Sequence, residues 1–409
     1  MNVLQTMLLA LRAILRNKMR SFLTTLGIVI GVAAVIAMVA IGQGAKARVE
    51  EAFASMGSSL LIVMSGTTTS GGAQGGYGSL PTLTWDDLRA IQREVPAVRW
   101  AAPALRVGAQ VISDEQNWTT SVTGTTPDFF AIRDWSVTRG VPLTESDIES
   151  GAKVAVVGQT VAEKLYGRGA DPTGQLVRIK NVPFQIIGQL AKKGQSPMGQ
   201  DYDDAVFVPV STFRSKLQGG LKNYLTGVIM VGAISADSTA RAERQIASLL
   251  RDRHHLLAGA DDDFSIRNLT EMANAQAQGT KTLTSLLAAI AAVSLLVGGI
   301  GIMNIMLVSV TERTREIGLR MAVGAKPRNI LAQFLVEATT LSLLGGLIGV
   351  TLGVVIALEV ARRFGWAMIV SPGIMLLAVG FSALVGIGFG MYPASKASRL
   401  DPIDALRYE

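Results

Sequence analysis

The densest group of ionic side chains in the sequence lies in the segment 312–320. Acids and bases alternate along it, as Glu312, Arg313, Arg315, Glu316 and Arg320. On a helix, each of these glutamates lies three or four residues from an arginine, which is the spacing that allows side chains to form ion pairs. A short helix with internal ion pairs is suited to docking onto a partner protein. A basic loop that only sets membrane topology is the alternative, but such a loop needs positive charge and not alternating signs.

The surroundings of this segment limit what it can be. Uncharged apolar runs precede and follow it, and Gly318 and Gly324 allow a break and a turn. An ionic segment held close to the bilayer on both sides has no room to form a large domain. It is therefore expected to be a short, membrane-anchored element that receives force from a partner on one side of the membrane.

Other side chains that could do chemistry are sparse. The sequence contains no cysteine, and it lacks the glycine-rich pattern with which P-loop proteins hydrolyse ATP. Its two histidines, His254 and His255, are adjacent and cannot converge on one helix face, so we expect no metal site there. No Ser/His/Asp set stands out. The sequence predicts no enzymatic activity, and no metal or cofactor bound by this chain.

Two aspartate clusters resemble known elements without completing them. Asp201, Asp203 and Asp204 begin like a calcium loop, but the glycine and the glutamate that such a loop needs at its sixth and twelfth positions are missing. We expect a solvated loop there. The run 261–263 is expected to cap the start of a helix.

Four apolar runs are long enough to cross a bilayer, which takes about 20 residues. They lie at 22–42, 283–310, 334–360 and 372–392. Each must be helical, because lipid offers no partner to a free backbone group. The first run exceeds the apolar core of a signal peptide, about 7–15 residues, so we interpret it as an uncleaved span. Residues 1–21 fit an amphipathic cytoplasmic helix or an extension of that span.

The distribution of charge predicts the orientation. Basic residues in 1–21 and in 311–333 place both segments, and with them the tail 393–409, in the cytoplasm. The 38 Lys and Arg residues exceed the 31 Asp and Glu residues, which gives a net charge of +7. The two signs balance within 43–282, so the excess lies beside the membrane, where it fits topology and lipid contact rather than nucleic-acid binding. We expect a multi-pass protein of the inner membrane with 43–282 outside the cytoplasm.

The segment 43–282 has the pattern of a mixed α/β domain. Its expected strands lie at 154–157, 205–208 and 228–231, with a hairpin formed by 176–180 and 184–190. Its expected helices lie at 160–165 and 237–257, and helical stretches at 44–56 and 269–282 lead into and out of the domain as a stalk would. The glycine-rich stretch 67–79 is expected to be a loop.

Glycines recur in the spans at four-residue spacing, which lets helix backbones approach closely. They are Gly27 and Gly31 in the first span, Gly345, Gly349 and Gly353 in the third, and Gly386 and Gly390 in the fourth. We favour packing within the chain for the third and fourth spans. The glycines of the first span fit either such packing or a dimer interface.

Two polar residues in or near the spans have alternative roles. Glu337, at the inner edge of the third span, either reaches the membrane interface, which we favour, or pairs with a base of the charged segment. Asn304, inside the second span, fits an interhelical hydrogen bond better than a polar path for cargo.

Motifs along the chain resemble those of the MacB/FtsX-type ABC transporter permeases. The sequence ERTREIGLRMAVGA at 312–325 is similar to the family's hallmark, and NKMRSFLTTLGI at 17–28 is similar to its entry into the first span. The tail resembles the family in YPASKA at 392–397 and DPIDALR at 401–407. In the outer segment, 125–130, 154–158 and 195–204 look like the MacB periplasmic core. The resemblance covers essentially the whole chain.

The resemblance implies four transmembrane helices with a large mixed α/β extracytoplasmic domain inserted between the first two. It also implies a homodimer served by two copies of an ABC ATPase, which binds ATP and magnesium. In this family the ATPases drive motion through the cytoplasmic segment and the second span to the outer domain, a process called mechanotransmission. The residues that would couple to the ATPase are Glu312, Arg313, Arg315, Glu316, Ile317, Gly318 and Arg320. Because the sequence begins with the membrane part, we expect the ATPase on a separate polypeptide.

The leading hypothesis is the permease subunit of an exporter of drugs, peptides or similar substrates. A periplasmic adaptor protein and an outer-membrane channel would receive the substrate, as in tripartite members of the family. One alternative is a permease similar to LolC and LolE, which extracts lipoproteins. Another is a signal transducer similar to FtsX, which controls a cell-wall hydrolase, but the length of 43–282 argues against it.

Overall fold

The computed structural model describes residues 18–54, 57, 59–66, 69–70, 73–74, 81–196, 199–218, 223–364 and 371–407. The chain divides into two compact units, one formed by 1–48 with 277–409 and the other by 49–276. The expected amphipathic helix before residue 18 lies outside the described residues. So does most of the expected loop 67–79, of which 69–70 and 73–74 form two short paired strands, β2 (Thr69–Ser70) and β3 (Ala73–Gln74).

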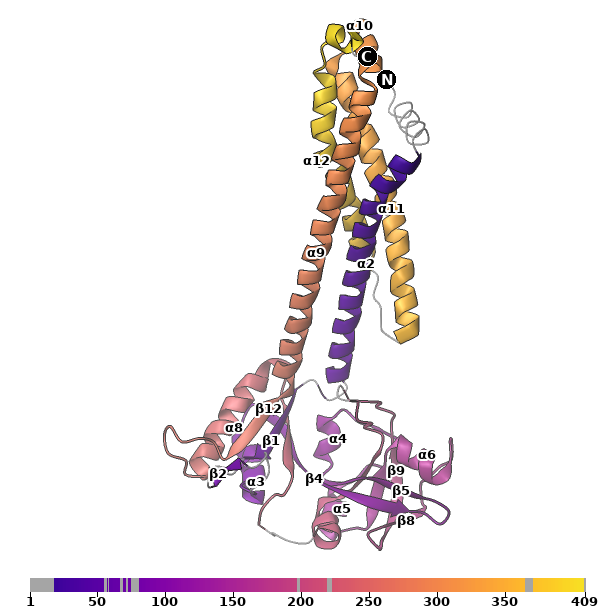
Figure 1. Cartoon of the computed structure of the whole chain (residues 1–409). Coiled ribbons are helices and arrows are strands. Elements are labelled where there is room, and N and C mark those ends of the chain that lie inside the picture. The colour runs from indigo at the N-terminus through magenta and orange to yellow at the C-terminus, as the bar shows by residue number, and fades with distance from the viewer. Residues whose placement is uncertain are drawn as a thin grey trace. The chain divides into compact units, whose positions relative to one another are not determined.

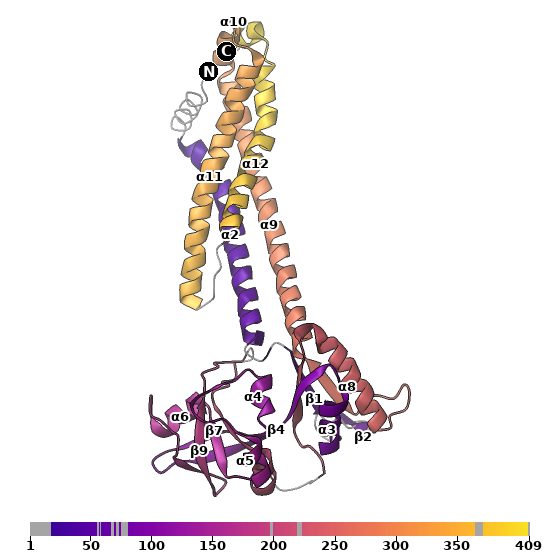
Figure 2. The ribbon, with the colours of Figure 1, turned by 180° about the vertical axis from the view of Figure 1, so that it is seen from behind.

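The first unit is built from long helices that coincide with the four predicted apolar runs. They are α2 (Lys18–Ala54), α9 (Leu269–Glu312), α11 (Pro327–Phe364) and α12 (Pro372–Ser398). Within the described residues, these four helices are long and apolar enough to cross a membrane. At 44 residues, α9 is about twice as long as a bilayer requires. Figures 1 and 2 show α11 and α12 side by side.

Close helix contacts explain why glycine recurs in the spans. A Cβ atom added to Gly27 would lie 3.1 Å from the Gly298 backbone of α9. One added to Gly349 would lie 2.8 Å from the Val32 side chain of α2. Further contacts of this kind join Gly31 to Leu295, Gly345 to Ile28, Gly353 to Ile36, Gly386 to Ser342 and Gly390 to Ala338. The glycine stripes of the first, third and fourth spans therefore all pack against helices of the same chain.

Two short helices complete this unit, α10 (Thr314–Ala322) and α13 (Pro402–Arg407). The second span, α9, does not run without interruption into the charged segment. Arg313 leaves the helical conformation, with ψ near 14°, and separates α9 from α10. Gly318 does not break the helix, whereas Gly324 makes the expected turn with a φ of 99°. Pro327 then starts α11, where its missing N–H has no helical partner to lose.

The second unit is a mixed α/β domain, as predicted. Its strands are β1 (Leu60–Ser65), β4 (Val98–Ile112), β5 (Asn117–Thr125), β6 (Val137–Gly140), β7 (Val154–Val157), β8 (Leu176–Ile179), β9 (Val182–Leu190), β10 (Ala205–Pro209), β11 (Val228–Ala233) and β12 (Phe264–Asn268). The sheet order is β12-β1-β11-β4-β5-β10-β7-β9-β6, and β8 pairs with β4 and β9. The first half of β4 pairs with β11 and the second half with β5, so this long strand joins the two parts of the sheet.

Helices cover the sheet and bury apolar clusters against it (Figure 1). They are α3 (Trp85–Glu94), α4 (Asp128–Ile132), α5 (Glu145–Ser150), α6 (Gln159–Tyr166), α7 (Val210–Thr212) and α8 (Thr239–Arg253), with a π-turn at Phe213–Leu217 and a 3₁₀ turn at Ala236–Ser238. The strands expected at 154–157, 205–208 and 228–231 and the helices at 160–165 and 237–257 are confirmed. The expected hairpin is also present, although its turn falls at Lys180 and Asn181, which both have positive φ.

The structure corrects the expectations for the aspartate clusters, although Asp201 is exposed as expected. Asp203 does not lie in a solvated loop, because it is 2% exposed and its carboxylate accepts the backbone N–H groups of Lys193 and Gly194 at 2.7 and 2.9 Å. Asp204 accepts the Trp118 indole N–H at 2.8 Å. The run 261–263 caps no helix, since β12 follows it directly.

Asp263 instead takes part in a partly buried ionic cluster with His254. The His254 ring lies 2.7 Å from the Asp263 carboxylate through Nδ1 and 3.2 Å from the Asp87 carboxylate through Nε2. Asp87 also caps α3 and accepts a hydrogen bond from Arg253 of α8 at 2.8 Å. The hydrogen bond to Asp87 is the main reason that the pKa of His254 rises to about 8. The cluster ties α3 and α8 to the start of β12.

The His254 cluster predicts a dependence of stability on pH. Because the pKa in the folded protein, about 8, exceeds the value of about 6.5 for a free histidine, the stabilisation is complete below pH ~6.5. It is lost as the pH rises through 8. We expect the free energy of unfolding of the outer domain to fall by about 1–2 kcal/mol over this interval, as followed by tryptophan fluorescence. His254→Gln should remove this pH dependence, whereas His255→Asn should keep it. An unchanged pH profile in His254→Gln would refute the assignment.

Candidate functional site

The charged segment forms α10, and its side chains divide between a buried and an exposed side. Ile317 and Gly318 are buried in the first unit, whereas Glu312, Arg315 and Glu316 are exposed. Ile317 belongs to the apolar core formed by the long helices. The sequence alone grouped these residues as one docking set, and the structure separates those that seat the helix from those that a partner could contact.

The contact between α10 and α13 depends on a glycine. A Cβ atom added to Gly318 would lie 2.7 Å from the Cβ of Ala405, which is closer than real Cβ atoms approach one another. Ala405 is itself buried at 2% exposure. The side chain of Asp401 accepts the backbone N–H of Ile403 at 2.8 Å and so helps to start α13. The C-terminal helix is therefore seated directly on the charged segment, at the end of the bundle that Figure 1 labels α10.

Two arginines fasten α10 to the beginning of α11. Arg320 donates to Gln333 at 2.9 Å and pairs with Glu316 at 2.5 Å. Arg313, at the junction of α9 and α10, lies 3.4 Å from the Glu337 carboxylate. Glu337 is only 6% exposed, so the favoured interpretation that it reaches the membrane interface is wrong and the alternative, an ion pair with the charged segment, is confirmed.

Large apolar side chains are exposed on both short helices. They are Leu319 (58%) and Val323 (84%) on and just after α10, and Ile403 (66%) and Leu406 (43%) on α13. We call these four residues, on their two packed helices, the apolar platform. Outside a bilayer, contiguous exposed apolar patches commonly mark sites of protein interaction, and these four side chains lie on helices that pack together. The charges of this region were recognisable in the sequence, whereas these four residues were missed, although their apolar character among ionic neighbours was a signal.

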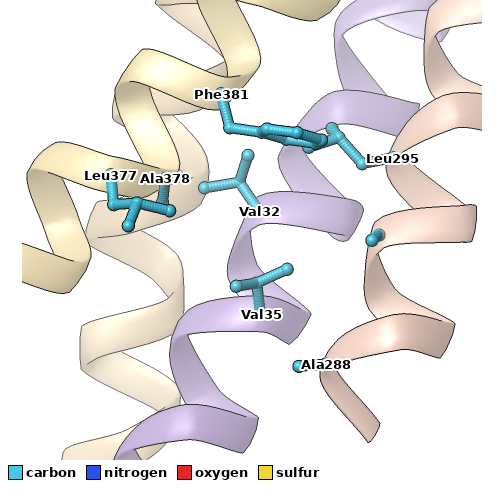
Figure 3. Close-up of a pocket in the computed structure, with 8 residues that line it drawn as sticks. Val32, Val35, Ala288, Leu295, Leu377, Ala378 and Phe381 are labelled. Carbon is cyan, nitrogen blue, oxygen red and sulfur yellow. The ribbon is translucent and has the colours of Figure 1, made fainter. Parts of the chain in front are cut away.

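A cavity of about 180 Å³ lies among the long helices of the same unit (Figure 3). Residues of α2, α9 and α12 line it, and all of them are apolar: Val32, Val35, Ala288, Ala292, Leu295, Leu377, Ala378 and Phe381. In Figure 3 the ring of Phe381 points toward Leu295. Such a lining suits an alkyl group and offers no ligand to a polar cargo.

These features define a class of protein. Membrane-spanning helices carry an extracytoplasmic α/β domain between the first two spans and a compact pair of short helices after the second. The comparison with protein families gives the particular family. Residues 21–249, more than half of the chain, match the MacB-like periplasmic core domain, and 288–402 match the FtsX-like permease C-terminal domain. The chain belongs to the MacB/FtsX-type ABC transporter permeases.

Individual relatives agree with this assignment. The macrolide export ATP-binding/permease protein MacB of Syntrophobacter fumaroxidans is 44% identical over 98% of this chain, which covers 63% of that protein. The protein of the same name from Bdellovibrio bacteriovorus is 42% identical over 96% of this chain, which covers 60% of it. The chain thus spans about six tenths of the length of these relatives. The crystal structure of the periplasmic region of MacB from Actinobacillus actinomycetemcomitans is 19% identical to this chain and superposes with a TM-score of 0.45. The match covers 56% of this chain and 97% of the chain in that crystal structure.

Proposed function

We propose that this chain is the permease part of an ABC-type exporter and transmits the work of an ABC ATPase to its outer domain. The observation that carries the proposal is the apolar platform, where exposed Leu319 and Val323 accompany a helix whose Ile317 is buried in the core of the long helices. A helix held in this way would pass a push from a docked partner on to the spans. The family assignment supplies the partner that would dock there.

The ion pairs of α10 explain how a push would pass onward. Arg313 joins the start of α10 to Glu337 of α11, and Arg320 joins its end to Gln333 one turn earlier on the same helix. Motion of α10 would therefore move α11 together with α9, which ends one residue before Arg313. The 44 residues of α9 extend beyond the bilayer and would carry the motion outward.

Substrate would be handled by the outer domain and need not cross within the spans. The apolar lining of the cavity in Figure 3 supports this route, because it provides no hydrogen-bonding group for a polar cargo. Since the relatives are named for macrolide export, we propose macrolides or similar drugs and peptides as substrates. The functional assembly would be a homodimer in the inner membrane with two ATPase copies, which hold ATP and magnesium. A periplasmic adaptor and an outer-membrane channel would complete it.

The proposal requires the apolar platform to face the cytoplasm, and cysteine labelling tests this. Because the sequence has no cysteine, a single one can be introduced at exposed Glu115 of the outer domain or at exposed Lys326 beside α10. We expect Glu115→Cys in intact cells to react with a membrane-impermeant maleimide, and Lys326→Cys to react only after the membrane is opened. The opposite pattern would invert the topology and remove the platform from reach of any cytoplasmic ATPase.

A further inference from the structure

Asn304 lies on the exposed side of α9, away from the rest of its own unit. Leu295, Ile302 and Met306 are buried and form the face of α9 that packs within the chain. Asn304 is exposed on the opposite side of the helix, in line with the exposed Val297 and Ile300. Among the residues that the structure describes, none forms a hydrogen bond with its amide. The interhelical hydrogen bond expected from the sequence is therefore not made between the described residues of one chain.

The position of Asn304 makes an unsatisfied amide costly. It lies eight residues before Glu312, which is about 12 Å along the helix at 1.5 Å per residue. This depth is inside a hydrocarbon layer about 30 Å thick, where lipid chains offer no donor or acceptor. A polar group in this environment is generally buried against another helix. A group outside the described part of the chain must therefore supply the hydrogen bonds.

The chemistry of the amide favours an identical amide as its partner. An asparagine side chain carries both a donor and an acceptor, so two copies related by a twofold axis can satisfy each other with a pair of hydrogen bonds. This self-complementarity is specific to a second copy of the same residue. A lipid tail cannot provide it, and an apolar cargo would leave both amides unpaired.

The surroundings of Asn304 fit such a pairing. The exposed apolar residues before and after it form one stripe along α9: Leu286, Ile290, Val293, Val297, Ile300 and Val308. A Cβ atom added to Gly301, one turn before Asn304, would meet nothing within 4 Å, so a second helix has room to approach. A single buried asparagine within an apolar stripe is also the arrangement that fixes register in paired helices.

We propose that α9 pairs with α9 of a second copy of this chain through a symmetric hydrogen bond between the two Asn304 amides. This inference deepens the proposed function, since it rests on the homodimer named there and gives it an interface. The amide pair would set the register of the two helices and leave their outer parts free to move.

Disulfide trapping in native membranes tests the pairing without any transport assay. Asn304→Cys would be the only cysteine in the chain, and on a twofold axis it must meet itself within the ~7 Å Cα separation that a disulfide allows. We expect an oxidant to produce a covalent dimer from Asn304→Cys, and also from Ile300→Cys on the same stripe. The matched control is Leu384→Cys, on an exposed part of α12, which should remain monomeric. No dimer from Asn304→Cys, or equal cross-linking of Leu384→Cys, would overturn the proposal.

A second measurement uses side chains that keep the fold. Asn304→Leu should raise the dissociation constant of the dimer in detergent by about 3- to 10-fold, as expected for one interhelical hydrogen bond. Asn304→Gln, which retains an amide, should restore most of the affinity. An unchanged dissociation constant in Asn304→Leu would also reject the pairing. If the unmodified chain coupled to its ATPase and formed dimers, but Asn304→Cys gave no covalent dimer and Asn304→Leu left the dissociation constant unchanged, the inference would fail while the proposed function stood.

Discussion

Replacing Leu319 and Val323 with aspartate is expected to abolish the response of ATP hydrolysis to the permease. The two side chains are 58% and 84% exposed, so the charges enter water in the free chain and should leave its fold intact. In a docked complex the same charges would be buried in an apolar contact. Losing two apolar anchors and burying two carboxylates should weaken ATPase binding by at least about 100-fold.

The measurement is ATPase binding and ATP turnover with the permease reconstituted in nanodiscs. The control is Leu257→Asp, which changes an equally exposed leucine (79%) in the outer domain and should have no effect. If the double variant bound and stimulated the ATPase normally, the apolar platform would not be the docking surface. The exposed Arg320–Glu316 pair should contribute less to ATPase binding than the apolar platform does. Ion pairs in water stabilise by only about 0–1 kcal/mol.

Removal of Arg313 is expected to destabilise the spans more than any surface change in α10. Its partner Glu337 has a side chain that is 8% exposed, so Arg313→Ala leaves a buried carboxylate without a counter-charge. The cost of breaking a buried pair in this way is about 3–5 kcal/mol, and the 26% exposure of the Arg313 side chain should place the value toward the lower end. We expect a lower melting temperature in detergent and a lower yield of folded protein.

A double-mutant cycle separates pairing from packing. Arg313→Met combined with Glu337→Leu replaces the pair by apolar groups of similar size, and it should recover most of the lost stability. Because the link between α10 and α11 would then lack its ionic contact, we expect this double variant to fold but to couple poorly to the ATPase. Additive destabilisation by the two changes would show that Arg313 and Glu337 act independently.

The membrane part was predictable from sequence because one strong rule applies there. A free backbone group has no partner in lipid, so a long apolar run must become a helix. The ends of the helices followed weaker rules. Outside the bilayer, α9 continues through polar residues to a length of 44, and it begins at Leu269, where the helical stretch 269–282 was expected to begin. In the outer domain, individual strands such as β7 were predictable, but the pairing of β4 with both β11 and β5 depends on contacts far apart in the sequence.

The candidate site was only partly predictable for the same reason. The charges of α10 are local and could be recognised by their spacing. The packing of α13 on α10 joins Gly318 to Ala405 across a large sequence separation, so the side of α13 that is exposed could not be derived from local spacing. His254 shows the same limit, because its partner Asp87 is 167 residues away and adjacent histidines gave no hint of it.

The central claim is that ATP-driven motion enters at the apolar platform and leaves through the outer part of α9. The most direct test is a distance measurement by double electron–electron resonance, with one spin label at exposed Gln278 of each copy in the assembled transporter. The account predicts that the distance between the two labels changes when the ATPase binds ATP, and that the change disappears in the variant with aspartate at positions 319 and 323. A distance that stays the same through the ATP cycle, in a transporter that still exports, would contradict it.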